Sequence, residues 1–258
     1  MNTDDTANVP VKSVERALAI VESIQERNGA TLSELADDLG VAKSTTHNHL
    51  RTLERRGYLV RDDGVFHIGL RFLDHGGFAR ERKASYRFVR PKLHEIARET
   101  NELCQFVVGQ HGEGFVLFQA RGTDAVETQS RIGSHGPLHS VPGGKAILAQ
   151  SSIEAVNSFV EDGGLPTTTA RTITDPDELV RELERITERG YAINRSEYIT
   201  GLDGIGVSIR SADEDVLGAL TVLGPSHRLD DDPTEEAISD RLLDAANELE
   251  LNVTYSRV

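Results

Sequence analysis

The sequence is poor in cysteine and has no long apolar run. The single cysteine among 258 residues, Cys104, cannot form an internal disulfide and cannot by itself supply a cysteine-rich metal site. No apolar stretch is long enough to span a bilayer. Residues 1–10 are polar and acidic, without the basic start and apolar stretch of a secretory signal. We therefore expect a cytoplasmic protein with no membrane partner, in which Cys104 is a buried structural thiol.

Basic residues are also scarce, with 28 Lys and Arg against 42 Asp and Glu and a formal net charge of −14. This deficit argues at first against nucleic acid as a partner, because binding to phosphate depends on Lys and Arg. Residues 43–61 are an exception, because this segment is locally basic. It contains one acidic residue, Glu54, and five basic ones: Lys43, Arg51, Arg55, Arg56 and Arg61. The acidic excess elsewhere, with Asp abundant and Arg the main cation, predicts a halophilic protein whose surface carboxylates keep it hydrated.

The length and the apolar content allow two domains. A chain of 258 residues with 38% hydrophobic residues can build two compact cores. A connecting helix is predicted at about residues 70–83, and its Gly76-Gly77 pair marks the boundary. The predicted domains are therefore residues 1–75 and residues 76–258.

The first helical pattern covers residues 13–28. Ser13 is a suitable N-cap, and Asn28 with Gly29 should end the helix. Four apolar side chains are expected on one face: Val14, Leu18, Val21 and Ile24.

Two more helices follow, with a tight turn between them. Thr31 and Glu34 form the pattern of a capping box at the start of the second helix, and Gly40 is expected to end it. The third helix begins near Lys43 and ends near Arg56. A helix, a glycine turn and a second helix are the signature of a helix-turn-helix.

A short hairpin is predicted after the third helix. Strands at residues 58–61 and 65–68 flank a turn in which Gly64 can adopt the positive φ that a tight hairpin needs. The hairpin corresponds to a wing, so residues 1–75 are predicted to form a winged helix-turn-helix.

The third helix has two chemically different faces. Thr46, Leu50 and Leu53 point inward, whereas the outward face is polar and basic. A recognition helix places such side chains against base edges and phosphates, and Asn48 suits adenine as Arg51 suits guanine or phosphate. The predicted DNA-binding residues are Thr31, Ser33, Lys43, Ser44, Thr45, His47, Asn48, Arg51 and Arg61. The alternative is a winged helix that serves only in dimerisation or protein docking.

The rest of the chain mixes helices and strands. Helices are predicted at residues 86–100, 143–150, 153–161, 175–189 and 233–251. Strands are predicted at residues 103–110, 114–119, 191–194, 205–210 and 216–223. We expect an α+β sensor domain with an antiparallel sheet.

An ordered set of segments resembles the IclR family of transcription regulators. The segments are KSVERAL at 12–18, LSELA at 32–36, KSTTH at 43–47, LERRGY at 53–58, PLH at 137–139, GKAILA at 144–149, GYA at 190–192 and GAL at 218–220. The resemblance covers about residues 11–250. It implies a GAF-like α/β effector domain, homodimers that can pair into homotetramers, a double-stranded DNA operator, and control by a small organic metabolite of a catabolic pathway, such as a sugar acid or an aromatic acid.

The predicted effector site centres on the loop before the helix at residues 143–150. Gly143 and Gly144 lead into this helix, whose backbone N–H groups can hold the carboxylate of an organic acid. The resemblance adds positions from three strands, although each residue also has a plain interpretation as turn or strand packing. Several members have cysteine or serine where this chain has Gly204 and Leu223, which favours a larger or less polar effector. The predicted effector-binding residues are His139, Ser140, Val141, Pro142, Gly143, Gly144, Asn194, Leu202, Gly204, Thr221 and Leu223.

No catalytic or metal motif is complete. A phosphate-binding loop around Lys145 would need glycine at His139 and Ser or Thr at Ala146. The helical spacing of His135 and His139 is interrupted by glycine and proline. We therefore expect a sequence-specific transcription regulator, with no enzymatic activity, cofactor or metal. The alternatives are a small-molecule enzyme with a winged-helix appendage and a ligand-free architectural DNA binder.

Overall fold

The computed structural model describes residues 11–211 and 215–255, and the chain divides into two compact units, Met1–Arg82 and Lys83–Val258. The two units are described separately below. The domain boundary predicted at residues 75 and 76 falls inside helix α4, Arg71–Arg80.

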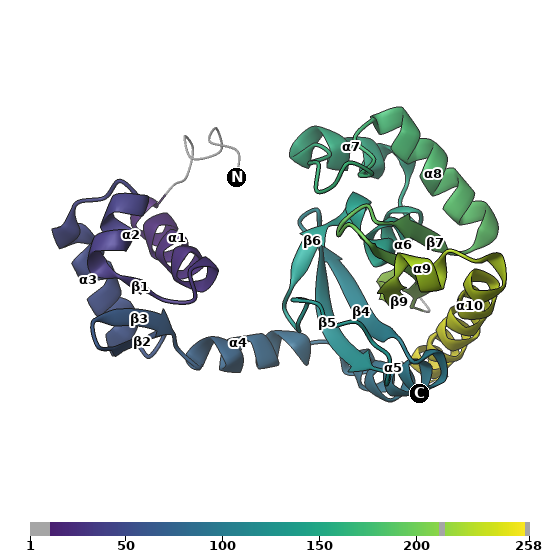
Figure 1. Cartoon of the computed structure of the whole chain (residues 1–258), viewed down its shortest axis with the longest axis horizontal. Helices are drawn as coiled ribbons and strands as arrows, with labels where there is room; N and C mark the ends of the chain where they lie inside the picture. The colour runs from purple at the N-terminus through teal and green to yellow at the C-terminus, as the bar shows by residue number, and fades with distance from the viewer. Residues whose placement is uncertain (1–10, 212–214, 256–258) are drawn as a thin grey trace. The chain divides into compact units, whose positions relative to one another are not determined.

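The first unit packs three helices against a small antiparallel sheet (Figure 1). The helices are α1, Lys12–Glu26, α2, Leu32–Asp38, and α3, Lys43–Arg55. The sheet has the order β1-β3-β2, with β1 at Ala30–Thr31, β2 at Leu59–Asp62 and β3 at Val65–Ile68. Its core consists of Ile20, Ile24, Ala30, Leu35, Leu50, Leu59 and Phe66. The winged helix-turn-helix is present as predicted.

Two predicted local features of this unit, the capping box of α2 and the hairpin turn of the wing, are confirmed. The Thr31 side chain accepts from the Glu34 amide and the Glu34 carboxylate accepts from the Thr31 amide, which is a full capping box. In the hairpin, Asp63 and Gly64 have φ values of 45° and 85°, so the turn uses the left-handed conformation that glycine adopts at little cost.

The start and the inward face of α1 differ from the prediction. The N-cap is Val11, without a side-chain hydrogen bond, and Ser13 lies inside the helix. Val14 and Leu18 are 56% and 52% exposed. The buried side chains of α1 are instead Ile20, Ser23 and Ile24. The helix therefore carries two apolar stripes, and only one of them packs on the core of its own unit.

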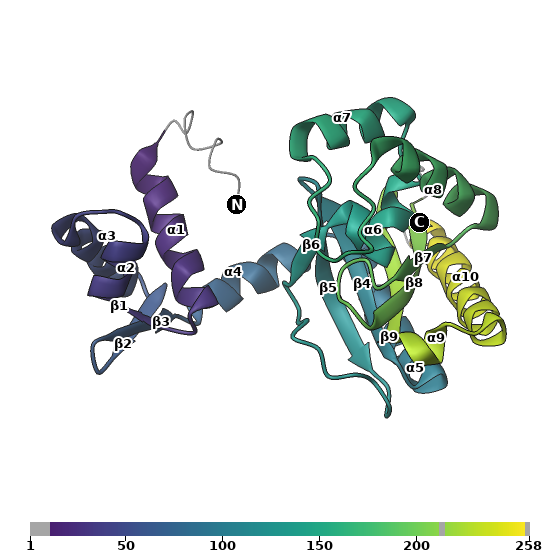
Figure 2. The same ribbon diagram turned by 45° about the horizontal axis from the view of Figure 1, so that its top comes forward.

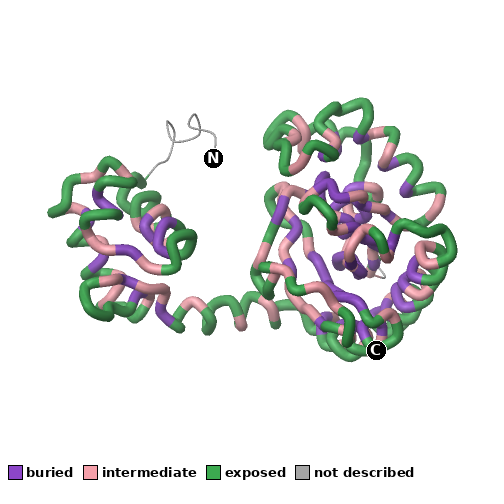
Figure 3. Tube along the Cα trace, in the orientation of Figure 1, coloured by how far each residue is buried: buried purple, intermediate pink, exposed green. Residues whose placement is uncertain are grey.

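The first half of helix α4 contacts the winged helix through Tyr58. The Tyr58 ring makes an edge contact with Phe72 at 5.0 Å between centroids, and its hydroxyl lies 2.8 Å from Nε2 of His75. No residue of α4 is buried, and Figure 3 colours the helix as exposed and intermediate throughout.

The second unit is built on a six-stranded antiparallel sheet with the order β6-β5-β4-β9-β8-β7. The strands are β4, Leu103–Gln110, β5, Glu113–Arg121, β6, His135–Pro137, β7, Ala192–Arg195, β8, Leu202–Arg210, and β9, Val216–Pro225. The central pairing joins β4 to β9, two strands that lie far apart in the sequence. The predicted α+β class with an antiparallel sheet is confirmed.

Helices cover both faces of this sheet (Figure 2). On one face, called the α10 face, lie α5, Val89–Thr100, and α10, Asp232–Tyr255, over a core that includes Phe106, Leu220 and Val222. On the other, called the α6 face, lie α6, Pro142–Leu148, α7, Ile153–Gly163, and α8, Pro176–Arg189. Short helical turns complete the unit: η2 at Ala84–Phe88, η3 at Leu138–Ser140 and α9 at Ser226–Leu229.

In the described ranges, no helix combines the length and the apolar character that crossing a membrane would require.

Candidate functional site

Helix α3 presents a polar stripe at the surface of the first unit. Thr46 and Leu50 are buried against the core and hold the helix in place. On the opposite side, five of the predicted DNA-binding residues are exposed: Lys43, Ser44, His47, Asn48 and Arg51. Thr45 is half-buried. The stripe therefore offers hydroxyl, amide, imidazole and guanidinium groups to a ligand outside the unit.

The start of α2 lies beside the start of α3. Nζ of Lys43 donates to Oγ of Ser33 at 3.1 Å, so these two predicted residues are neighbours. The Thr31 hydroxyl donates to Oε2 of Glu34 at 2.7 Å and accepts from the Glu34 amide at 3.4 Å. Because that hydroxyl is used by the helix cap, it has less capacity left for a phosphate oxygen than Ser33 has.

Arg61 lies on the wing, in strand β2, beside the C-terminal end of α3. Its side chain is 55% exposed, and Nε lies 3.8 Å from a Glu54 carboxylate oxygen. The guanidinium also lies 5.8 Å from the centroid of the Phe66 ring. Neither contact removes the arginine from solvent, so it remains able to reach an anionic partner.

In the second unit, several predicted effector residues form one row across three strands. Asn194 pairs with Gly204, and Gly204 pairs with Leu223. Because directly opposed residues of antiparallel strands share a face, their side chains lie together. Thr221 belongs to the next row on the same face, opposite Gly206.

The loop before α6 packs directly onto this row. Nδ2 of Asn194 donates to the Ser140 carbonyl at 2.6 Å, which joins the loop to β7. A Cβ on Gly143 would lie 2.9 Å from Cγ2 of Thr221, and a Cβ on Gly144 would lie 2.2 Å from the Leu138 carbonyl oxygen. Only glycine permits these approaches, so both glycines are required by the packing of the loop.

Leu223 occupies the space beside Gly204. A Cβ on Gly204 would lie 2.5 Å from Cδ2 of Leu223 and 3.0 Å from Cγ of Pro142. A larger residue at position 204 would therefore displace the leucine. The end of the site near Gly204 is apolar and tightly filled.

Three predicted residues lie less centrally. His139 is buried, with Nε2 3.2 Å from the Pro166 carbonyl, and burial lowers the pKa of its imidazole. Its ring is thus engaged with the segment between α7 and α8. Leu202 lies on β8 opposite Pro225, and Val141 occupies the N-cap position of α6; both are half-buried.

The sequence patterns did not reveal the polar groups buried under this site. Nζ of Lys145 is 2.6 Å from Oε1 of Glu197 and 2.6 Å from the Ile193 carbonyl, and Glu182 lies 4.0 Å away. Burial raises the pKa of Glu197, and the Lys145 ammonium partly offsets that effect. The sequence singled out Lys145 only because it follows Gly144, and no sequence pattern predicted Glu197 as its partner.

Gln105 is a second buried polar residue on the α6 face. Its Nε2 donates to Oγ of Ser130 at 2.8 Å, and its carbonyl accepts from the Thr221 hydroxyl at 3.4 Å. Its position inside the otherwise apolar start of strand Leu103–Gln110 could have predicted a buried polar residue here. The described ranges contain no group of three or more His, Cys, Asp or Glu residues placed to hold a metal ion.

Two family models match the chain. The model described as IclR helix-turn-helix domain matches residues 13–63, and the model described as Bacterial transcriptional regulator IclR C-terminal matches residues 85–251.

The chain is also similar to other regulators along most of its length. It is 32% identical to a probable HTH-type transcriptional regulator ArcR of Halobacterium salinarum, over 94% of both chains. It is 30% identical to the transcriptional repressor IclR of Escherichia coli, over 88% of this chain and 84% of the repressor. A solved IclR homolog from Microbacterium hydrocarbonoxydans, in complex with 4-hydroxybenzoate, superposes with a TM-score of 0.75 at 26% identity, covering 93% of this chain and 98% of the homolog.

Proposed function

The chain belongs to the IclR family, whose members are transcriptional regulators and not enzymes. From this we propose that the protein controls a catabolic operon by binding an operator and a small organic acid. The observation that carries the proposal is the exposed polar stripe of α3, whose opposite side is anchored in the core by Thr46 and Leu50.

We propose that residues 1–75 bind double-stranded DNA. The N-terminal end of a recognition helix enters the major groove, where Asn and Arg make bidentate contacts with adenine and guanine. Asn48 and Arg51 are exposed one helical turn apart and suit these contacts, with Lys43 and Ser33 at the neighbouring phosphates. We assign Arg61, on the wing, to the DNA backbone or the minor groove.

We propose that residues 76–258 bind the effector on the α6 face. The support is the convergence of the loop before α6 with Asn194, Gly204, Thr221 and Leu223. An organic acid is favoured because the solved homolog holds 4-hydroxybenzoate. The filled space between Gly204, Leu223 and Pro142 requires the ligand either to displace Leu223 or to lie toward Thr221 and Gln105.

The second copy of the chain is the proposed partner in solution. Helix α4 has 10 residues and buries none of them, although an isolated helix of this length is marginal in water. Its Leu73 and Phe78 are 73% and 81% exposed, and α1 adds the exposed stripe of Val14 and Leu18. Covering such surfaces stabilises a dimer through the hydrophobic effect. Pairing of dimers into tetramers stays a prediction of the family resemblance.

The experiment has a DNA arm and a ligand arm. Binding sites are selected from random duplex DNA, and the footprint of the enriched site is determined at fixed salt. Sugar acids, aromatic acids and short keto acids are then screened for a rise in melting temperature and for a change in affinity for the selected site. Enrichment of one site, and an acid that changes its affinity, are the expected results. Equal binding of unrelated DNA would contradict the proposal that the protein is a sequence-specific regulator. Turnover of a bound acid would contradict the proposal that it is not an enzyme.

A further inference from the structure

A cavity lies on the α10 face of the C-terminal unit, apart from the proposed effector site. It has a volume of about 440 Å³ and is lined by η2, the ends of β8 and β9, and the last turns of α10. This volume is within the range of small-molecule sites, about 300–1,000 Å³. Its floor is Leu217 and Val253, which belong to the core between the sheet and α10. The sheet therefore separates it from the row of Gly204 and Leu223.

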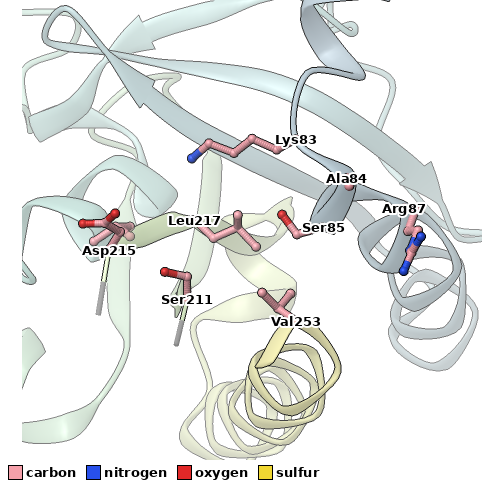
Figure 4. A pocket seen from close by; sticks show the side chains of 9 residues that line it. Lys83, Ala84, Ser85, Arg87, Ser211, Asp215, Leu217 and Val253 are labelled. Carbon is pink, nitrogen blue, oxygen red and sulfur yellow. The ribbon is translucent and has the colours of Figure 1, made fainter. Parts of the chain in front are cut away.

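The walls of the cavity carry opposite charges (Figure 4). Lys83 extends its ammonium group along one wall, toward the end where Ser211 and Asp215 lie. Ser85 adds a hydroxyl, and Arg87 adds a second cation at the other end. Within the described part of the chain, none of these three charged side chains forms an ion pair, although Lys83 lies 5.9 Å from the centroid of the Tyr86 ring.

Lys83, Arg87 and Asp215 are exposed at the rim of the cavity, where they are open to a ligand from solvent. The more buried cations of the unit, Lys145, Arg195, Arg228 and Arg241, are by contrast all held by carboxylates. Lys83 and Asp215 share one cavity without neutralising each other. A ligand that presents both charges would satisfy the two walls together, and charge-assisted hydrogen bonds are the stronger kind.

We propose that this cavity is a binding site for a small zwitterion with an apolar side chain, of the α-amino acid class. The ligand carboxylate faces the Lys83 ammonium group, and its own ammonium group faces Asp215 and the hydroxyl of Ser211. The apolar side chain lies on Leu217 and Val253. Lys83 is the first residue of the second unit, so a ligand here contacts the segment through which the chain enters that unit.

The test measures binding of L-valine, L-leucine and L-phenylalanine to the full chain by calorimetry. Two analogues of leucine complete the set, namely 4-methylpentanoate, which lacks the amino group, and isopentylamine, which lacks the carboxylate. At least one amino acid is expected to bind, with the matched analogues weaker by about tenfold or more, because each loses a charge-assisted contact.

Variants of the two walls test the placement of the ligand. Lys83→Met and Asp215→Asn should each weaken amino acid binding by about tenfold or more. Lys12→Met and Asp240→Asn remove matched exposed charges elsewhere and should bind as the parent does. The proposal is overturned if no amino acid binds, if the analogues bind equally well, or if both wall variants retain the parental affinity. These outcomes leave the DNA and effector arms of the proposed function unaffected.

Discussion

Lys145 is the buried cation beneath the loop before α6. Its ammonium group is enclosed by the Glu197 carboxylate and the Ile193 carbonyl, each at 2.6 Å. Asn194 continues the connection, since its Oδ1 accepts from the Glu197 amide at 3.1 Å and its Nδ2 binds the Ser140 carbonyl. The loop, β7 and α6 are thus joined through one buried polar network.

Replacement of Lys145 by Met should destabilise the protein by about 3–5 kcal/mol, because it leaves the Glu197 carboxylate buried without its cation. Urea unfolding of the full chain gives the value. Lys92→Met is the control, since the carboxylates that Lys92 pairs with, on Glu95 and Glu248, are 38% and 55% exposed and stay solvated without it. We expect that control to cost about 1 kcal/mol or less. Equal losses in the two variants would contradict the role assigned to the buried pair.

Cys104 should be unreactive in the folded protein. Its side chain is fully buried, and burial raises the pKa of its thiol to about 12. Since the thiolate is the reactive form, a thiol reagent at mildly alkaline pH should label the native chain very slowly and the urea-unfolded chain at once. As Cys104 is the single cysteine, the labelling has one source. Rapid labelling without denaturant would show that β4 is not packed as described.

At the residue scale, the sequence predicted local chemistry better than long-range partners. The capping box of Thr31 and Glu34 and the turn at Gly64 are decided by neighbours in the chain, and both are confirmed. The pairing of Lys145 with Glu197, and the packing of Leu223 against Gly204, join segments that lie far apart in the sequence. Composition and spacing therefore could not predict them. Whether the predicted DNA and effector residues bind their ligands stays a prediction.

At the scale of elements, α1 shows what periodicity leaves open. The spacing of Val14, Leu18, Val21 and Ile24 predicted an amphipathic helix with these four side chains inward. The helix is present and Ile24 is buried, but Val14 and Leu18 are exposed. The sequence did not show that Ile20 joins Ile24 on the stripe that packs on the core. A helix with two apolar stripes requires tertiary information to assign each one.

The exposed stripes should hold two copies together. Val14→Lys combined with Leu18→Lys places two cations on the exposed stripe of α1 and should convert a dimer into a monomer in sedimentation velocity runs. Val60→Lys is the control, because Val60 is also exposed, at 51%, but lies on the wing. Unchanged circular dichroism should show that folding is retained, since neither stripe residue belongs to the core. A double variant that still sediments as a dimer would exclude α1 from the interface.

For the whole molecule, the order of helices and strands and the antiparallel sheet were predictable, but the strand order was not. Strands β4 and β9 pair at the centre of the sheet across more than a hundred residues of sequence, and no local pattern encodes that pairing. The short strands β1 and β6 were missed because each is defined only by its partner strand. The GAF-like description of the unit stays a prediction.

The acidic excess predicts a salt-dependent stability. A net charge of −14 destabilises the compact state through self-repulsion, which salt screens. The melting temperature should therefore rise by several degrees between about 0.1 M and about 1 M KCl, where the Debye length falls to about 3 Å. A further rise above that concentration would point to hydration by the surface carboxylates, as expected for a halophilic protein. A melting temperature that is constant or falls with KCl would contradict the account.

The central claim is that the exposed stripe of α3 reads base pairs. Its direct test is the affinity of Asn48→Ala and Arg51→Ala for the selected operator and for its single-base variants, at fixed salt. Each substitution should weaken operator binding by about 1–3 kcal/mol and relax the preference at one base position. Arg56→Ala, an exposed residue at the C-cap of α3, should keep the parental preference. If both stripe variants bind the operator as tightly and as selectively as the parent, α3 is not the recognition helix.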